Sequence, residues 1–146
     1  MLRGLARWLR AAGYDASWTY GIDDAALLYH AYCESRTVLT ADGGILRSRA
    51  VRAAGTRVLY VPNALPPVAQ ARLVLAALHL PLRATRCLAC GGELVEVPKG
   101  TVQDEAPPRS YEAYARFYRC DRCRRLLWRG THWQRIARTL DELRPS

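Results

Sequence analysis

Long apolar runs are missing from this 146-residue sequence, and none approaches the roughly 18 to 20 residues needed to cross a bilayer. The N-terminal segment MLRGLARWLR also lacks the apolar core and the cleavage site of a secretory signal. The chain contains no glycine-rich phosphate loop, nucleophile elbow or dinucleotide-binding fingerprint. These absences predict a cytoplasmic protein without a membrane partner, and they exclude several common enzyme classes.

Lysine is almost absent, because 21 of the 22 basic residues are arginine and only Lys99 is lysine. Acidic residues are also few, and the net charge of +9 favours polyanionic partners such as nucleic acid. Between Arg116 and Arg138 eight arginines stand against one acid, Asp121, with aromatic residues between them. Such a mixture suits RNA, preferably single-stranded, although a solvated basic surface and a small aromatic core are the alternatives. The candidate nucleic-acid-binding residues are Arg7, Arg124, Arg125, Trp128, Arg129 and His132.

Four of the five cysteines form two identical pairs, Cys87-Leu-Ala-Cys90 and Cys120-Asp-Arg-Cys123. Two such knuckles supply the four thiolates that tetrahedral Zn²⁺ prefers, so Cys87, Cys90, Cys120 and Cys123 predict a structural zinc ribbon. Two disulfides or unligated core cysteines are the alternatives, and disulfides would require an oxidising compartment. The fifth cysteine, Cys33, is expected to be a small buried hydrophobic residue. The segment 98–110 between the knuckles is expected to be a polar excursion.

Periodicity before residue 84 predicts strands that alternate with helices. Expected helices cover residues 2–12, 24–34, 45–54 and 66–78, and expected strands cover 14–20, 37–40 and 57–61. Helices of about ten residues between strands indicate a parallel α/β sheet. We therefore expect an α/β domain over residues 1–84, followed by a zinc ribbon with a terminal helix over residues 85–146.

Two acidic positions fall where a parallel α/β sheet forms its sites, near the carboxyl ends of strands. Asp42 follows the strand Val38–Thr40, and Asp24 begins the preceding helix beside Asp23. Several carboxylates at one point could hold Mg²⁺ or Mn²⁺, which would activate water for phosphodiester hydrolysis. The alternative is local, since Asp42 could only shape a turn and Asp23 or Asp24 could only cap a helix.

The ordered set of motifs resembles the Mut-seven C-terminal RNase family over nearly the whole chain. The resemblance rests on Gly4–Arg10, Gly13–Asp15, Asp24–Leu28, Glu34–Arg36, Val38–Asp42, the two cysteine pairs, Tyr118–Cys120 and Trp128–Trp133. It implies a PIN-like nuclease domain fused to a zinc ribbon, and a metal-dependent ribonuclease. It also implies that Asp24 and Asp42 are catalytic carboxylates, with Asp23 as an outer-shell candidate.

The sequence departs from the family pattern at its beginning. Family members usually start with an apolar strand that ends in an Asp just before the position of Met1, and this chain shows neither the strand nor that Asp. The first strand of the PIN-like sheet is therefore expected to be missing, through a misassigned start, truncation or loss of part of the site. A smaller departure is Ala41, where the family tends to carry arginine.

The favoured function is metal-dependent RNA cleavage, with the ribbon holding the RNA and with weak or no activity in this 146-residue form. A non-catalytic RNA-binding module with a degenerate acid cluster is the first alternative. An adaptor whose ribbon docks on a protein partner is the second, and a homo-oligomer also stays open.

Overall fold

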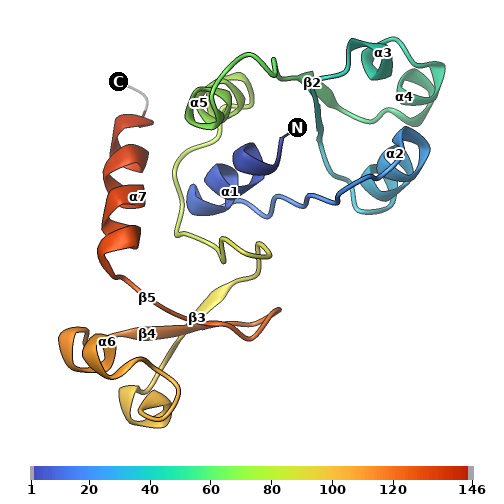
Figure 1. The fold of residues 1–146 in the computed structure, drawn as a ribbon. Helices are drawn as coiled ribbons and strands as arrows, with labels where there is room; N and C mark the ends of the chain where they lie inside the picture. Colours follow the sequence, from blue (N-terminus) through green and yellow to red (C-terminus); the bar gives the residue numbers. More distant parts are fainter. Residues whose placement is uncertain (1, 145–146) are drawn as a thin grey trace. The chain divides into compact units, whose positions relative to one another are not determined.

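The computed structural model describes residues 2–144, which form two compact units (Figure 1). The α/β unit contains the described residues of Met1–Ala6 and Trp18–Leu80, and the ribbon unit contains Arg7–Ser17 and the described residues of Pro81–Ser146. The helix α1 (Arg3–Ala11) thus contributes its first residues to the α/β unit and the others to the ribbon unit. The domain limits expected from the sequence, 1–84 and 85–146, stay a prediction.

Two short parallel strands form the sheet of the α/β unit. Strand β1 (Val38–Thr40) pairs with β2 (Val58–Tyr60) so that Val38 is opposite Val58 and Thr40 is opposite Tyr60. The helices of this unit are α2 (Asp24–Cys33), α3 (Gly43–Leu46), α4 (Arg49–Ala54) and α5 (Pro67–Ala77). The expected parallel α/β arrangement is therefore confirmed, on a small scale.

Local chemistry explains where the helices of the α/β unit begin. The side chain of Asp23 accepts the N–H of Ala26 at 2.8 Å and caps α2, while Pro67 begins α5, where its missing N–H costs nothing. A Cβ at Gly4 would lie 2.7 Å from Cγ of Pro67, so glycine permits the close approach of α1 and α5. The apolar residues buried in this unit are Leu5, Ala6, Ala31, Val38, Ile45, Val51, Val61, Ala71, Val74 and Leu75.

Three local expectations were wrong. Residues 14–20 form no strand, although a short one was expected there. The helix expected over 45–54 is two helices, because Ser48 caps α4 by accepting the N–H of Ala50 and so interrupts the turn. Cys33 is exposed at the end of α2 and is not a core residue, because it lies on the solvent face of that helix beside Tyr32.

The ribbon unit contains a three-stranded antiparallel sheet in the order β3–β4–β5. These strands are β3 (Leu94–Val97), β4 (Phe117–Cys120) and β5 (Leu126–Trp128). Between β3 and β4 lie the 3-10 helix η1 (Lys99–Val102) and the helix α6 (Pro108–Ala113). After β5 the chain enters α7 (Thr131–Glu142), which is the expected terminal helix. None of the described helices is long and apolar enough to cross a bilayer.

The two faces of this sheet differ, because side chains alternate along each strand. On one face Val97, Phe117 and Trp128 are cross-strand neighbours, and Phe117 is fully buried. This core face packs against Val102 and Ala106, which are also buried. The segment 98–110 was expected to be a polar excursion, and this was wrong because it carries these apolar residues into the ribbon core. The opposite face, which we call the open face, carries Leu94, Tyr118 and Leu127.

Candidate functional site

The four paired cysteines converge at one end of the ribbon sheet. Their sulfur atoms all lie within 4.8 Å of one another, and Cys87 and Cys120 are buried. The first knuckle closes through the N–H of Gly91, which donates to the carbonyl of Cys87 at 2.7 Å. In the second knuckle the N–H groups of Arg122 and Cys123 each approach Sγ of Cys120 at 3.4 Å. The four cysteines can therefore hold a metal ion such as zinc.

All four are free thiols, so the disulfide alternative does not describe this structure. Between the knuckles, the sulfur atoms lie 3.4 Å apart for Cys90 and Cys120 and 3.7 Å apart for Cys87 and Cys123. A disulfide bond is about 2.05 Å long. Four soft sulfur donors around one point are the set that zinc or an iron–sulfur centre prefers, so the donor chemistry fits Zn²⁺.

The thiols do not share one pKa. Burial raises the pKa of Cys87 to about 12. Burial also disfavours the Cys120 thiolate, but the N–H groups of Cys123 and Arg122 outweigh it and lower the pKa of Cys120 to about 7. Metal binding must release the remaining thiol protons, so metal affinity rises with pH.

Two consecutive glycines allow the first knuckle to pass close to the second. Gly91 adopts φ +83°, and a Cβ at Gly92 would lie 2.5 Å from Sγ of Cys120 and 2.8 Å from Cβ of Arg122. The Cys120 sulfur therefore occupies the space that any side chain at position 92 would require.

The Gly92→Ala substitution is expected to weaken zinc binding by about 10- to 100-fold, the range seen when groups supporting metal ligands are disturbed. The new methyl group must displace a metal-ligating sulfur. Competition with a chromophoric zinc chelator measures the change. Gly100→Ala is the matched control, because a Cβ at Gly100 has no neighbouring atom within 4 Å. Equal zinc affinity of the two variants would contradict the knuckle geometry.

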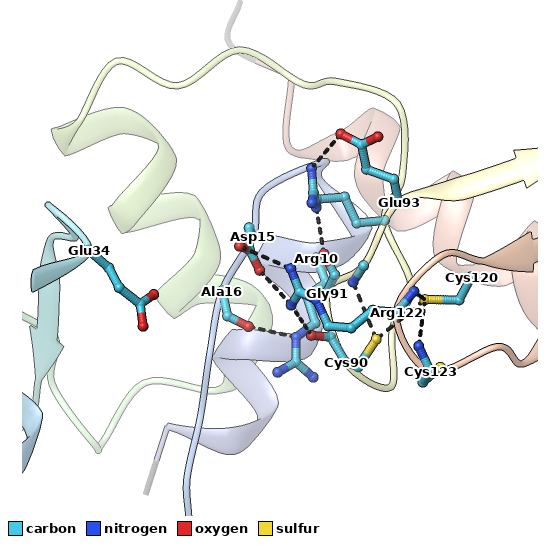
Figure 2. A network of polar contacts seen from close by, with 12 residues as sticks. Arg10, Asp15, Ala16, Glu34, Cys90, Gly91, Glu93, Cys120, Arg122 and Cys123 are labelled. Atoms are coloured by element: carbon cyan, nitrogen blue, oxygen red, sulfur yellow. Dashed lines mark hydrogen bonds and ion pairs between the residues drawn. The ribbon is translucent and has the colours of Figure 1, made fainter. Parts of the chain in front are cut away.

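A polar network ties residues 7–17 to both knuckles (Figure 2). Arg10 donates to the carbonyls of Leu88 and Ala89 at 3.1 Å each, and to the carbonyl of Ala16 at 2.7 Å. From the second knuckle, Arg122 reaches Asp15 at 3.3 Å and the carbonyl of Cys90 at 3.1 Å. The end of α1 and the metal cluster therefore belong to one folding unit. Sequence reasoning missed this network, since its partners are separated by up to 107 residues.

The three candidate catalytic acids are exposed residues of the α/β unit. Asp42 caps α3 by accepting the N–H of Gly44 at 2.7 Å, and Asp23 caps α2. Asp24 occupies the first turn of α2. Within residues 2–144 only the four cysteines form a group of three or more possible metal-ligand residues. Asp23 and Asp42 therefore do cap helices, as the alternative predicted. Each uses one carboxylate oxygen for the cap, and the other oxygen is a candidate metal ligand.

A cavity of about 460 Å³ opens on the open face of the ribbon sheet, wholly within the ribbon unit. Tyr118 and Leu127 line it from the sheet, and Trp133 and Ile136 line it from α7. Arg129 stands at the cavity with its guanidinium 5.4 Å from the centre of the Tyr118 ring. A smaller cavity of about 160 Å³ shares Leu88, His132 and Ile136 with it.

Two candidate residues far apart in sequence meet beside these cavities. Nη2 of Arg7 lies 2.6 Å from Nε2 of His132, and both side chains are exposed. Arginine can only donate, so in this contact Nε2 of His132 is the acceptor. The structure therefore brings together Arg7, Arg129 and His132 around one surface of the ribbon unit.

The other candidate nucleic-acid-binding residues, Trp128, Arg124 and Arg125, are not part of the group formed by Arg7, Arg129 and His132. Trp128 is half-buried and packs on the core face, with its ring 6.0 Å from that of Phe117, so much of it is structural. Arg124 and Arg125 are exposed in the turn after the second knuckle. Tyr118 and Trp133 are two of the aromatic residues that interleave with the arginines in the sequence, and they line the cavity from both sides. The alternation along β4 turns the side chain of Tyr118 away from that of Phe117 and so toward the open face.

In a comparison with protein families, the model of the Mut7-C RNAse domain matches residues 1–140. The match covers nearly the whole chain, and the protein therefore belongs to this family. Comparison with curated proteins and with solved structures finds no significant match.

Proposed function

We propose that the protein is a metal-dependent ribonuclease that holds single-stranded RNA on its ribbon unit. The observation that carries the proposal is the family match, which spans both units of the chain. The convergence of Arg7, Arg129 and His132 beside an aromatic cavity supports RNA binding in particular. The parallel strands and surrounding helices of the α/β unit support a PIN-like nuclease domain.

Asp24 and Asp42 are the proposed ligands of a catalytic Mg²⁺ or Mn²⁺, with Asp23 in the outer shell. Among the described residues, neither Asp24 nor Asp42 belongs to a group of three or more possible metal ligands. Mg²⁺ is often bound through one or two carboxylates together with substrate phosphates and water, so this set is compatible with a site that RNA completes. When bound, such an ion would activate water and stabilise the leaving oxygen.

The direct test is an RNA cleavage assay with the zinc-loaded full chain. We expect 5′-labelled single-stranded RNA to be cut slowly in Mn²⁺ or Mg²⁺, and to stay intact when the divalent ion is omitted. Binding without cleavage in either ion would favour the second candidate, a non-catalytic RNA-binding module. That candidate draws support from the described residues, in which no group of three or more possible metal ligands contains an acidic residue.

Replacing Arg124, Arg125 and Arg129 together by alanine is expected to flatten the dependence of log K on log salt by about 2. Each phosphate neutralised on a single strand contributes about 0.7 to this slope, and backbone contacts carry no sequence information. Affinity should therefore fall about equally for different RNA sequences. Fluorescence anisotropy across a salt series measures the slope.

The matched control replaces Arg49, Arg52 and Arg109, which are exposed arginines outside the 116–138 stretch. This variant loses the same charge and should keep a slope close to that of the unaltered protein. Equal slopes for all three proteins would indicate that the arginines of the ribbon unit face solvent or a protein partner. The adaptor hypothesis would then be favoured.

A further inference from the structure

We propose that the cavity on the open face of the ribbon sheet binds one unpaired nucleobase of single-stranded RNA, between the rings of Tyr118 and Trp133. This inference rests on the proposed function and makes it more specific. It assigns to the ribbon unit a defined site for one base. Attraction between arginine side chains and RNA phosphates alone would not require such a site.

The walls of the cavity suit a flat aromatic ligand. Tyr118 and Leu127 lie on the open face of the sheet, while Trp133 and Ile136 come from the first turns of α7. These side chains leave about 460 Å³, within the roughly 300 to 1,000 Å³ typical of ligand pockets. A nucleobase has two apolar faces that stack on aromatic rings and a polar edge that forms hydrogen bonds. Thr131, which also lines the cavity, provides a hydroxyl for that edge.

The charges around the cavity select a polyanion. Arg129 lies over the Tyr118 ring, and Arg7 lies beside His132 at the adjoining smaller cavity. Among the described residues, no aspartate or glutamate lines either cavity. Phosphates on either side of a bound base would therefore meet the side chains of Arg7 and Arg129.

The same features distinguish unpaired RNA from other occupants. Bases inside a duplex are stacked on their neighbours and cannot enter a side pocket, so a double strand gains only backbone contacts. An apolar ligand or peptide would contact the apolar walls of the cavity. It would leave Arg7 and Arg129, which form a cationic rim at the edge of the two cavities, without an anionic partner. A single strand satisfies both the aromatic walls and the rim.

The test compares binding of a labelled single-stranded RNA dodecamer and of the matching duplex to the zinc-loaded full chain. Trp133→Ala is expected to weaken single-strand binding about 5- to 150-fold, the range for losing one stacked base. Duplex binding should stay within about 2-fold, and Trp133→Phe should retain most of the single-strand affinity. Tyr32→Ala is the control, since Tyr32 is an aromatic residue 63% exposed on α2 and outside the cavity.

A second measurement needs no variant and so does not depend on how Trp133→Ala folds. RNA that carries 5-iodouridine forms photochemical crosslinks to aromatic side chains stacked on the modified base. We expect mass spectrometry to map the crosslinks on the unaltered protein to Tyr118 or Trp133.

Crosslinks elsewhere, together with equal single-strand affinity of Trp133→Ala and the unaltered protein, would overturn the inference. RNA cleavage by the unaltered protein would then leave the proposed function standing. The reverse outcome is also distinguishable, since crosslinks at Tyr118 or Trp133 without any cleavage would support the base site and count against nuclease activity in this 146-residue form. A fluorescent apolar dye that occupies the cavity and is not displaced by RNA would assign the cavity to an apolar ligand and overturn the inference.

Discussion

Replacing Cys120 with serine is expected to abolish stable zinc binding and to unfold the ribbon sheet, while much of the α/β unit stays folded. The substitution removes one of four thiolates whose sulfur atoms lie within 4.8 Å of one another. Structural zinc contributes roughly 10 to 16 kcal/mol in small units of this kind, as much as the total stability of many domains. The apolar core of the ribbon, built around Phe117, is too small to replace that contribution.

Hydrogen exchange read by mass spectrometry can follow each unit separately. Amides of β3, β4 and β5 should lose their protection in Cys120→Ser, and those of α5 should keep theirs. The contacts from Arg10 to the first knuckle should be lost as well, so the end of α1 should exchange faster.

Cys33→Ser is the matched control, because Cys33 is an exposed thiol outside the cluster. It should bind one zinc ion per chain and keep the exchange pattern of the unaltered protein. A Cys120→Ser protein with a protected ribbon sheet would show that the cluster is not a structural metal centre.

Asp42→Asn is expected to lower the rate of RNA cleavage at least about 100-fold, in any form of the protein that cleaves, without changing RNA affinity. Loss of groups that only support a metal ligand already costs 10- to 100-fold, and Asp42 is proposed to be a ligand itself. The substitution is expected to impair metal binding at the proposed site without disturbing the fold. Asparagine caps a helix as well as aspartate, so the bond to the N–H of Gly44 and the start of α3 should survive.

Cleavage should be measured by gel analysis under single-turnover conditions in Mn²⁺, and binding should be measured separately without divalent ions. Asp104→Asn removes an exposed carboxylate from the ribbon unit and should cleave at the unaltered rate. Undiminished cleavage by Asp42→Asn would leave Asp42 with only its capping role. It would also move the search for the catalytic centre to other residues.

The sequence by itself determined the metal cluster, because two residues between cysteines fix the geometry of a knuckle locally. The same is true of α1, α2 and α5, where periodicity, a capping aspartate and a proline act within a few residues. The parallel pairing of β1 and β2 also followed from the alternation of strands and helices. Each of these features is signalled by residues that are close together in the sequence, although the two knuckles and the two strands meet only in the tertiary structure.

Only the tertiary structure decided which distant side chains meet. The approach of Arg7 to His132, the network from Arg10 and Arg122 to the knuckles, and the cavity between Tyr118 and Trp133 all join separate segments. The position of Trp128 on the core face was also decided there, since strand pairing sets which rings are buried. Contacts of this kind depend on how elements pack in three dimensions, and residue spacing along the chain does not encode them.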